Sequence, residues 1–267
     1  MSNQKNGFGL RKPPKLLGMA AAFADAISES CNMKTRFYER TAYRFSEEPV
    51  PNCFMKLDEY FDTRFGDANV ASTHINVLLA ESVCSRMADL EMYAFLIEDA
   101  RKRHGLDKDS DVRGAIRTRS FLIGYLGAGR ALLDSASVGL SILYRLPLNN
   151  TERSFGNGDF WHQLVTVAPP VHRRYHPMRL FFNEVLRWNN ELVLRVPPLM
   201  VSHQHFGQFS SREMHLRALD DPAVDWPQML ADPTRLNWID PLHLHDRWKP
   251  KLLSLCEKMC VDIEACT

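Results

Sequence analysis

Long hydrophobic runs are missing from this 267-residue sequence. No uninterrupted apolar stretch reaches the roughly 18 residues that a membrane-spanning helix needs, so the sequence predicts no transmembrane segment. An excess of one charge is missing as well, because 33 Lys and Arg residues face 32 Asp and Glu residues. The formal net charge of +1 gives no global signature of polyanion binding, although it leaves a local basic patch open.

The sequence also lacks the short motifs of common hydrolases and zinc proteins. It contains no HExxH, no CxxC and no GxSxG. Six cysteines are present: Cys31, Cys53, Cys84, Cys256, Cys260 and Cys266. Their spacing matches no disulfide framework, and Cys256 and Cys260 are one helical turn apart. We therefore expect free thiols in a reducing cytoplasm, with no metal and no cofactor.

Persistent period-two alternation is absent too, whereas helical periodicity is strong. Over 67–103, apolar residues recur at steps of three and four: Ile75, Leu79, Val83, Met87, Leu90, Ala94 and Ile97. The segment 119–146 is apolar on nearly every side, which predicts a central helix over 112–146 that Pro147 ends. The predicted fold class is therefore all-α, a helical bundle of four to six principal helices with irregular connections.

The expected organisation is a mobile arm over 1–15 and a single α-helical domain over 16–267. The domain core is expected at about 68–201 and a C-terminal helix at about 242–266. Further helices are predicted over 16–30, 56–65, 160–167, 178–195 and 210–219. The basic arm and the apolar segment after it also resemble a signal peptide, but we favour an amphipathic first helix. A small strand pair is compatible with 199–208.

Asp134 is the one acid in the middle of the predicted central helix. A carboxylate in apolar surroundings is expensive to bury alone, so we expect it to be buried with a partner. Arg187 and Arg195 are candidate partners, and a polar group of the same helix is another. Asp134, Arg187 and Arg195 are therefore candidate binding residues, forming either a structural ion pair that fixes helix register or a ligand site between core helices.

Two His-x-His pairs could supply imidazole ligands to a metal. One contains His203 and His205, and the other contains His243 and His245. A structural zinc site needs four ligands and a catalytic site three, yet no other zinc motif accompanies these pairs. We expect loop histidines that make ordinary hydrogen bonds, and a histidine-ligated metal protein remains an alternative.

Three segments together resemble one known pattern. They are the apolar helix 119–146 with Asp134, the sequence Asp-Phe-Trp at 159–161, and the helix 181–195 followed by Val-Pro-Pro. This order resembles the HEPN-like helical bundles of prokaryotes, in which a Phe-Trp pair precedes the last core helix. The resemblance covers about residues 68–201. It implies a bundle of four or five helices, often dimeric.

In active members, the resemblance implies a metal-independent ribonuclease. Its site contains an Arg, a following polar residue, and a His four to six residues further on. Arg187 and Asn189 correspond to the first part of this motif. The position of the His falls at Val193 or Leu194, and neither side chain can transfer a proton. The nuclease motif is therefore incomplete.

The expected function is a HEPN-like binding or assembly component without nuclease activity. The resemblance implies a role in RNA-related stress or phage defence, an RNA or protein partner, and a homodimer. The alternative is a metal-independent endoribonuclease with a relocated histidine. Its candidate catalytic residues are Arg187, Asn189, Arg195, His203 and His205.

Overall fold

A computed structural model describes residues 50–65, 74–104, 112–190, 200–202, 214–218 and 237–267. The helices are α3 (Asn52–Phe65), α5 (Ile75–His104), α6 (Val112–Leu143), α7 (Gly158–Val167), α8 (Pro169–Tyr175), the 3-10 helix η1 (His176–Met178), α9 (Arg179–Asn189) and α11 (Pro241–Ala265). The predicted all-α helical bundle is confirmed. None of the helices in these ranges has the length and hydropathy that a membrane crossing requires. The predictions for the arm 1–15 and the helix 16–30 fall outside the described residues.

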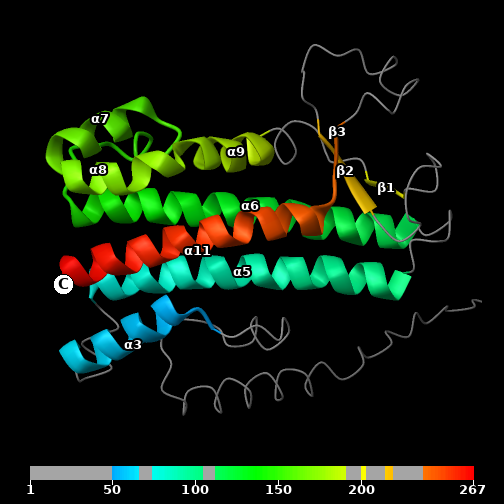
Figure 1. The fold of residues 1–267 in the computed structure, drawn as a ribbon, viewed down its shortest axis with the longest axis horizontal. Coiled ribbons are helices and arrows are strands. Elements are labelled where there is room, and N and C mark those ends of the chain that lie inside the picture. The colour runs from blue at the N-terminus through cyan, green and yellow to red at the C-terminus, as the bar shows by residue number, and fades with distance from the viewer. Residues whose placement is uncertain (1–49, 66–73, 105–111, 191–199, 203–213, 219–236) are drawn as a thin grey trace, which may run out of the picture. The chain divides into compact units, whose positions relative to one another are not determined.

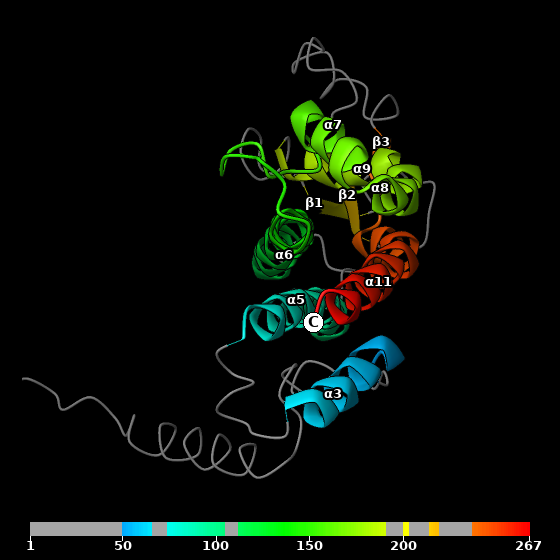
Figure 2. The ribbon, with the colours of Figure 1, turned by 90° about the vertical axis from the view of Figure 1, so that its left-hand side faces the viewer.

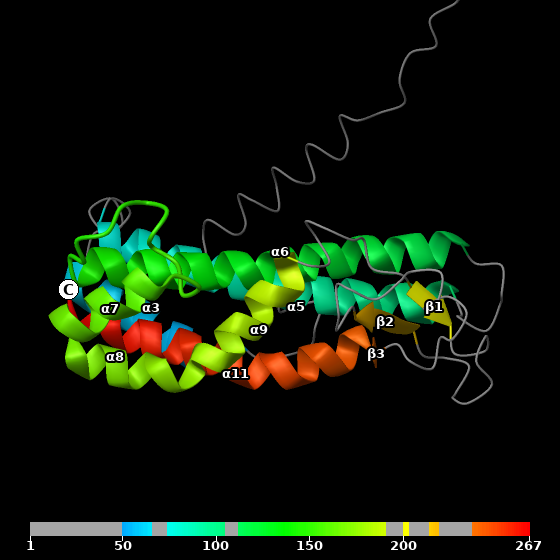
Figure 3. The same ribbon diagram turned by 90° about the horizontal axis from the view of Figure 1, so that it is seen from above.

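Two long antiparallel helices, α5 and α6, form the frame of the bundle, and α11 packs along both (Figure 1). Helix α3 covers one side of this frame, and α7, α8 and α9 lie on the other side (Figure 2). Seen from above, α9 crosses obliquely from α11 towards α6 (Figure 3). The α7–α9 segment is therefore supported by both α6 and α11.

The junction of α6, α9 and α11 is built from large aromatic side chains and one glycine. Trp248 is fully buried and stacks on Tyr125, with 5.8 Å between ring centroids. The ring of Phe181 meets Trp248 edge-on at 6.2 Å. A Cβ atom at Gly129 would lie 3.5 Å from both Trp248 and Val185. A small residue at Gly129 therefore lets α9 and α11 pack closely against α6.

Helix α6 is buried on one side only. Its buried residues include Leu122, Tyr125, Leu126, Leu132, Leu133, Ala136 and Leu140. Arg130 and Asp134 lie on a partly exposed side of the same helix. The helix ends at Leu143, and Arg145 then takes a positive φ of 51° before Pro147. The central position of α6 is thus confirmed, but its enclosure on every side is not.

Local side-chain and proline rules explain where α7 and α8 begin. The cap of α7 is Asn157, whose side chain accepts a hydrogen bond of 2.8 Å from the Asp159 amide. Asp159 itself lies inside the first turn. Pro169 and Pro170 do not simply end a helix, because they also form the first turn of α8. A proline is well tolerated there, since the first amides of a helix have no intrahelical partner.

A small antiparallel sheet supplements the bundle. Its strands are β1 (Met200–Ser202), β2 (Met214–Ala218) and β3 (Asn237–Ile239), in the order β1-β2-β3. Leu216 pairs with Met200 on one side and with Ile239 on the other. Within 199–208, the segment compatible with a strand pair, residues 200–202 form β1, and the strand that pairs with β1 lies outside this segment, at 214–218. The helix predicted over 210–219 is wrong, because 214–218 is the central strand and pairing on both sides overrides local helix propensity.

Candidate functional site

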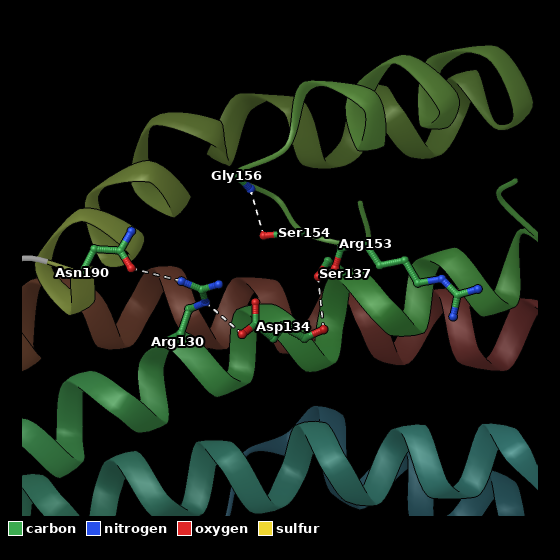
Figure 4. A network of polar contacts seen from close by, with 7 residues as sticks. All are labelled: Arg130, Asp134, Ser137, Arg153, Ser154, Gly156 and Asn190. Carbon is green, nitrogen blue, oxygen red and sulfur yellow. Dashed lines mark hydrogen bonds and ion pairs between the residues drawn. The ribbon is translucent and has the colours of Figure 1, made fainter. Parts of the chain in front are cut away.

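Asp134 belongs to a partly exposed polar network on α6 (Figure 4). The Arg130 Nε atom donates to Asp134 Oδ2 at 2.8 Å, one turn away on the same helix. The Arg130 guanidinium also donates to Asn190 Oδ1 at 3.4 Å, which links α6 to the end of α9. The Asp134 side chain is 43% exposed, so the predicted burial is wrong. The expected contact with a polar group of the same helix is confirmed.

The loop between α6 and α7 is fixed beside this network. The buried Ser137 hydroxyl lies 3.0 Å from the Arg153 carbonyl, and the Gly156 amide donates to Ser154 Oγ at 3.3 Å (Figure 4). The indole of Trp161 donates to the Phe155 carbonyl at 2.8 Å. These bonds attach the loop to α6 through Ser137 and to α7 through Trp161.

The sequence-predicted site residues are only partly brought together. Arg187 is exposed, and its guanidinium carbon lies 5.9 Å from the centroid of the Trp188 ring. Asn189 is buried. No contact between Arg187 and Asp134 occurs among the contacts of the described residues. Residues 195, 203 and 205 fall outside the described ranges, so the roles of Arg195, His203 and His205 stay predictions.

A cationic surface on α8 and α9 was missed by the sequence interpretation. The 24 residues 160–183 contain three Arg, three His and no Asp or Glu. Four of these side chains form what we call the α8 cationic surface: His172, Arg173, His176 and Arg179. Arg173, His176 and Arg179 are exposed, and His172 is half-buried. Near-neutral net charge hid this bias, which a count of charges in short windows would have revealed.

The buried Trp161 ring contacts three side chains of the α8 cationic surface. The rings of His172 and His176 meet Trp161 edge-on, at 6.0 and 5.9 Å between centroids, and lie 4.8 Å from each other. The Arg179 guanidinium carbon is 5.7 Å from the centre of the Trp161 ring. Burial, together with the charges of His176 and Arg179, lowers the pKa of His172.

Arg174 points away from this surface and anchors α8 to α11. It donates to Asp262 Oδ1 at 2.6 Å, and Tyr144 donates to the same oxygen at 2.7 Å. Tyr175 donates to Asp262 Oδ2 at 2.6 Å. Burial and the adjacent Asp262 carboxylate raise the pKa of the Tyr175 hydroxyl. This buried network gives the α8 cationic surface a rigid base.

A second buried polar network crosses the bundle where α5, α6 and α11 meet. Glu91 Oε2 lies 3.2 Å from Lys249 Nζ and 3.6 Å from His245 Nε2. The other ring nitrogen of His245 is 3.2 Å from the Tyr125 hydroxyl oxygen. Both histidines of this pair, His243 and His245, lie on α11 rather than in a loop. His245 is hydrogen-bonded, as expected. Across the described ranges, no three His, Cys, Asp or Glu side chains are grouped to hold a metal ion.

The described residues thus define an all-α bundle with one cationic surface and two buried polar networks. Comparisons with known proteins find no matching family model, no similar curated protein and no similar solved structure.

Proposed function

We propose that this chain is a HEPN-like helical-bundle protein that binds RNA through the α8 cationic surface and does not cleave it. The observation that carries the proposal is the grouping of His172, Arg173, His176 and Arg179 on a segment that contains no acid. Phosphate contacts from Arg and His supply most of the affinity of proteins that bind RNA without reading its sequence.

The geometry of the surface supports contact with a phosphate backbone. Arg173 and Arg179 carry permanent charge and exposed planar donors, which match the geometry of phosphate oxygens. The Trp161 ring contacts His172, His176 and Arg179, and no acidic side chain takes part in these three contacts. The surface therefore offers two exposed arginines, flanked by two imidazoles, on a preorganised base.

The resemblance supports the bundle type and the absence of cleavage. The order of the apolar helix, the Phe160-Trp161 pair and the helix that begins at Arg179 corresponds to the HEPN-like order. Val193 and Leu194 occupy the positions where that pattern has a proton-transferring His. A role in RNA-related stress or phage defence is the biological setting that we propose from this resemblance.

Salt-dependent RNA binding tests the proposal. We expect wild-type protein to bind a fluorescein-labelled single-stranded RNA of about 20 nucleotides with an affinity that falls as salt rises. The double variant Arg173→Ala/Arg179→Ala should weaken binding about tenfold or more and lower the slope of log K against log salt by about 1–2. Arg174 stays unchanged because it anchors α8.

The matched control removes two exposed arginines from other helices. Arg64→Ala/Arg86→Ala changes the net charge equally but alters only α3 and α5. It should bind RNA with nearly the wild-type salt slope. Equal losses in the two double variants would refute the α8 cationic surface as the binding site.

One observation favours metal-independent RNA cleavage as a second candidate function. Two imidazoles lie 4.8 Å apart beside the Arg179 guanidinium, and imidazole is the side chain that most often transfers protons in acid–base catalysis. The test is incubation of mixed RNA with purified protein in the presence of a chelator. Cleavage by wild type that His172→Ala and His176→Ala both lack would establish this activity, and our first proposal predicts none.

A further inference from the structure

His172 and His176 share one face of the helix at the end of α8. They are four residues apart, and the backbone amide of His176 donates to the His172 carbonyl, so the helical turn continues between them. Residues at this spacing are neighbours on a helix surface, with Cβ atoms about 5–6 Å apart. His176 is exposed and His172 is half-buried, so a solute can reach both residues.

The distance between the two imidazole rings fits a shared metal ion. A ring nitrogen lies about 2.0–2.1 Å from a bound transition metal, which places the metal about 3.2 Å from the ring centroid. Two rings that meet at one metal with an angle of about 90–110° therefore have centroids about 4.5–5.2 Å apart. The centroids of the His172 and His176 rings are 4.8 Å apart, which lies within that range.

We propose that His172 and His176 form a binding site for a divalent transition-metal ion such as Zn²⁺ or Ni²⁺. Each ring would supply one nitrogen lone pair. Water molecules would complete the coordination, because no group of three His, Cys, Asp or Glu side chains suited to a metal occurs in the described ranges. The inference does not rest on RNA binding, which we assign to the exposed arginines of the same surface.

Contacts within the protein hold the two rings in place. Trp161 meets both rings edge-on, and its indole donates to the Phe155 carbonyl at 2.8 Å. Arg174 attaches α8 to Asp262 of α11 at 2.6 Å. Preorganised ligands lose less conformational freedom on binding. Once one ring holds the metal, the second ring therefore binds it as an intramolecular ligand.

The surroundings of the pair favour a metal that prefers nitrogen ligands. The segment 160–183 contains no Asp or Glu, so it has no carboxylate for Mg²⁺ or Ca²⁺, whereas imidazole suits Zn²⁺, Ni²⁺ and Cu²⁺. Burial and the charges of His176 and Arg179 lower the pKa of His172, which favours the unprotonated ring that a metal requires. Because the neighbouring arginines repel a dication, binding should need both rings together.

Calorimetric titration of the untagged chain with Ni²⁺ tests the site. Ni²⁺ is the probe because thiols compete for Zn²⁺. We expect His172→Gln and His176→Gln each to weaken Ni²⁺ binding about tenfold or more, since a single ring cannot chelate. Excess Mg²⁺ should not compete with Ni²⁺. The matched control, His162→Gln/His243→Gln, removes two exposed imidazoles from α7 and α11 and should keep the wild-type affinity.

A second measurement uses the wild-type protein, so a variant that fails to fold does not remove the test. Diethyl pyrocarbonate modifies accessible neutral imidazoles, and mass spectrometry locates the modified residues. Ni²⁺ should protect His172 and His176, whereas His162 and His243 should stay as reactive as without metal. Wild-type Ni²⁺ affinity in both single variants would overturn the proposal, as would an equal loss in the control variant or modification of both rings at an unchanged rate.

Discussion

Replacing Asp262 with alanine should lower the free energy of unfolding by about 3–5 kcal/mol, because its carboxylate is completely buried and has three donors. Arg174 would lose its counterion, and the Tyr144 and Tyr175 hydroxyls would lose their acceptor. A buried hydroxyl without a partner costs about 1–3 kcal/mol, and Tyr175 is fully buried. Arg174 is one-third exposed, so water relieves part of its loss.

Urea unfolding followed by circular dichroism measures this change. The matched control is Glu257→Ala, which removes an exposed carboxylate from the same helix and should change stability by about 0.5 kcal/mol or less. In a double-mutant cycle, Asp262→Ala and Arg174→Ala should show a coupling of about 1–3 kcal/mol. A loss below about 1 kcal/mol for Asp262→Ala would show that α8 is not anchored through this carboxylate.

Glu91, Asp134 and Gly129 each give a further prediction. Burial raises the pKa of Glu91, but the neighbouring His245 and Lys249 lower it by more, so the pKa of Glu91 is lowered in the folded protein. The stabilisation from Glu91 is therefore present above the unfolded pKa and is lost as pH falls through the folded pKa. Glu91→Gln should make the free energy of unfolding fall less steeply with decreasing pH in the acid range. Asp134→Ala should cost about 1 kcal/mol or less in urea unfolding, because its pair with Arg130 is partly exposed, and a loss above about 3 kcal/mol would restore the buried-pair interpretation. Gly129→Leu should lower the thermal midpoint by overpacking the α6–α9–α11 junction, at about 1–3 kcal/mol, whereas Gly129→Ala should be tolerated better.

Helical periodicity predicted the frame of the bundle well. The apolar residues of α5 recur with the 3.6-residue period of a helix, and α6 is apolar on nearly every side, as a central helix would be. Both segments are long helices in the structure. Local rules failed where tertiary pairing decides the outcome. The segment 214–218 is a strand because β1 and β3 pair with both of its edges, and no local signal reports those partners.

The site was harder to predict because exposure depends on packing. In a helix that is apolar on nearly every side, sequence cannot say which side its neighbours will cover, and Asp134 lies on a side that they leave partly open. Arg130 is one turn away, so spacing alone offered it as a partner. The α8 cationic surface had a clear local signal in 160–183, but net charge averaged it away.

The position of α11 has a consequence for the order in which the bundle can form. The α5–α6 pair joins neighbouring segments, whereas α11 contacts α3 across 204 residues, at Tyr60 and Glu264, and reaches α8 across 88 residues, at Arg174 and Asp262. Closing such long loops lowers chain entropy before any contact compensates for it. We therefore expect the α5–α6 hairpin to fold first, with α3 and α8 secured only after α11 has docked. In a nascent chain that lacks α11, the Tyr60 hydroxyl of α3 and the Arg174 guanidinium of α8 would lack the α11 groups that they contact in the folded protein.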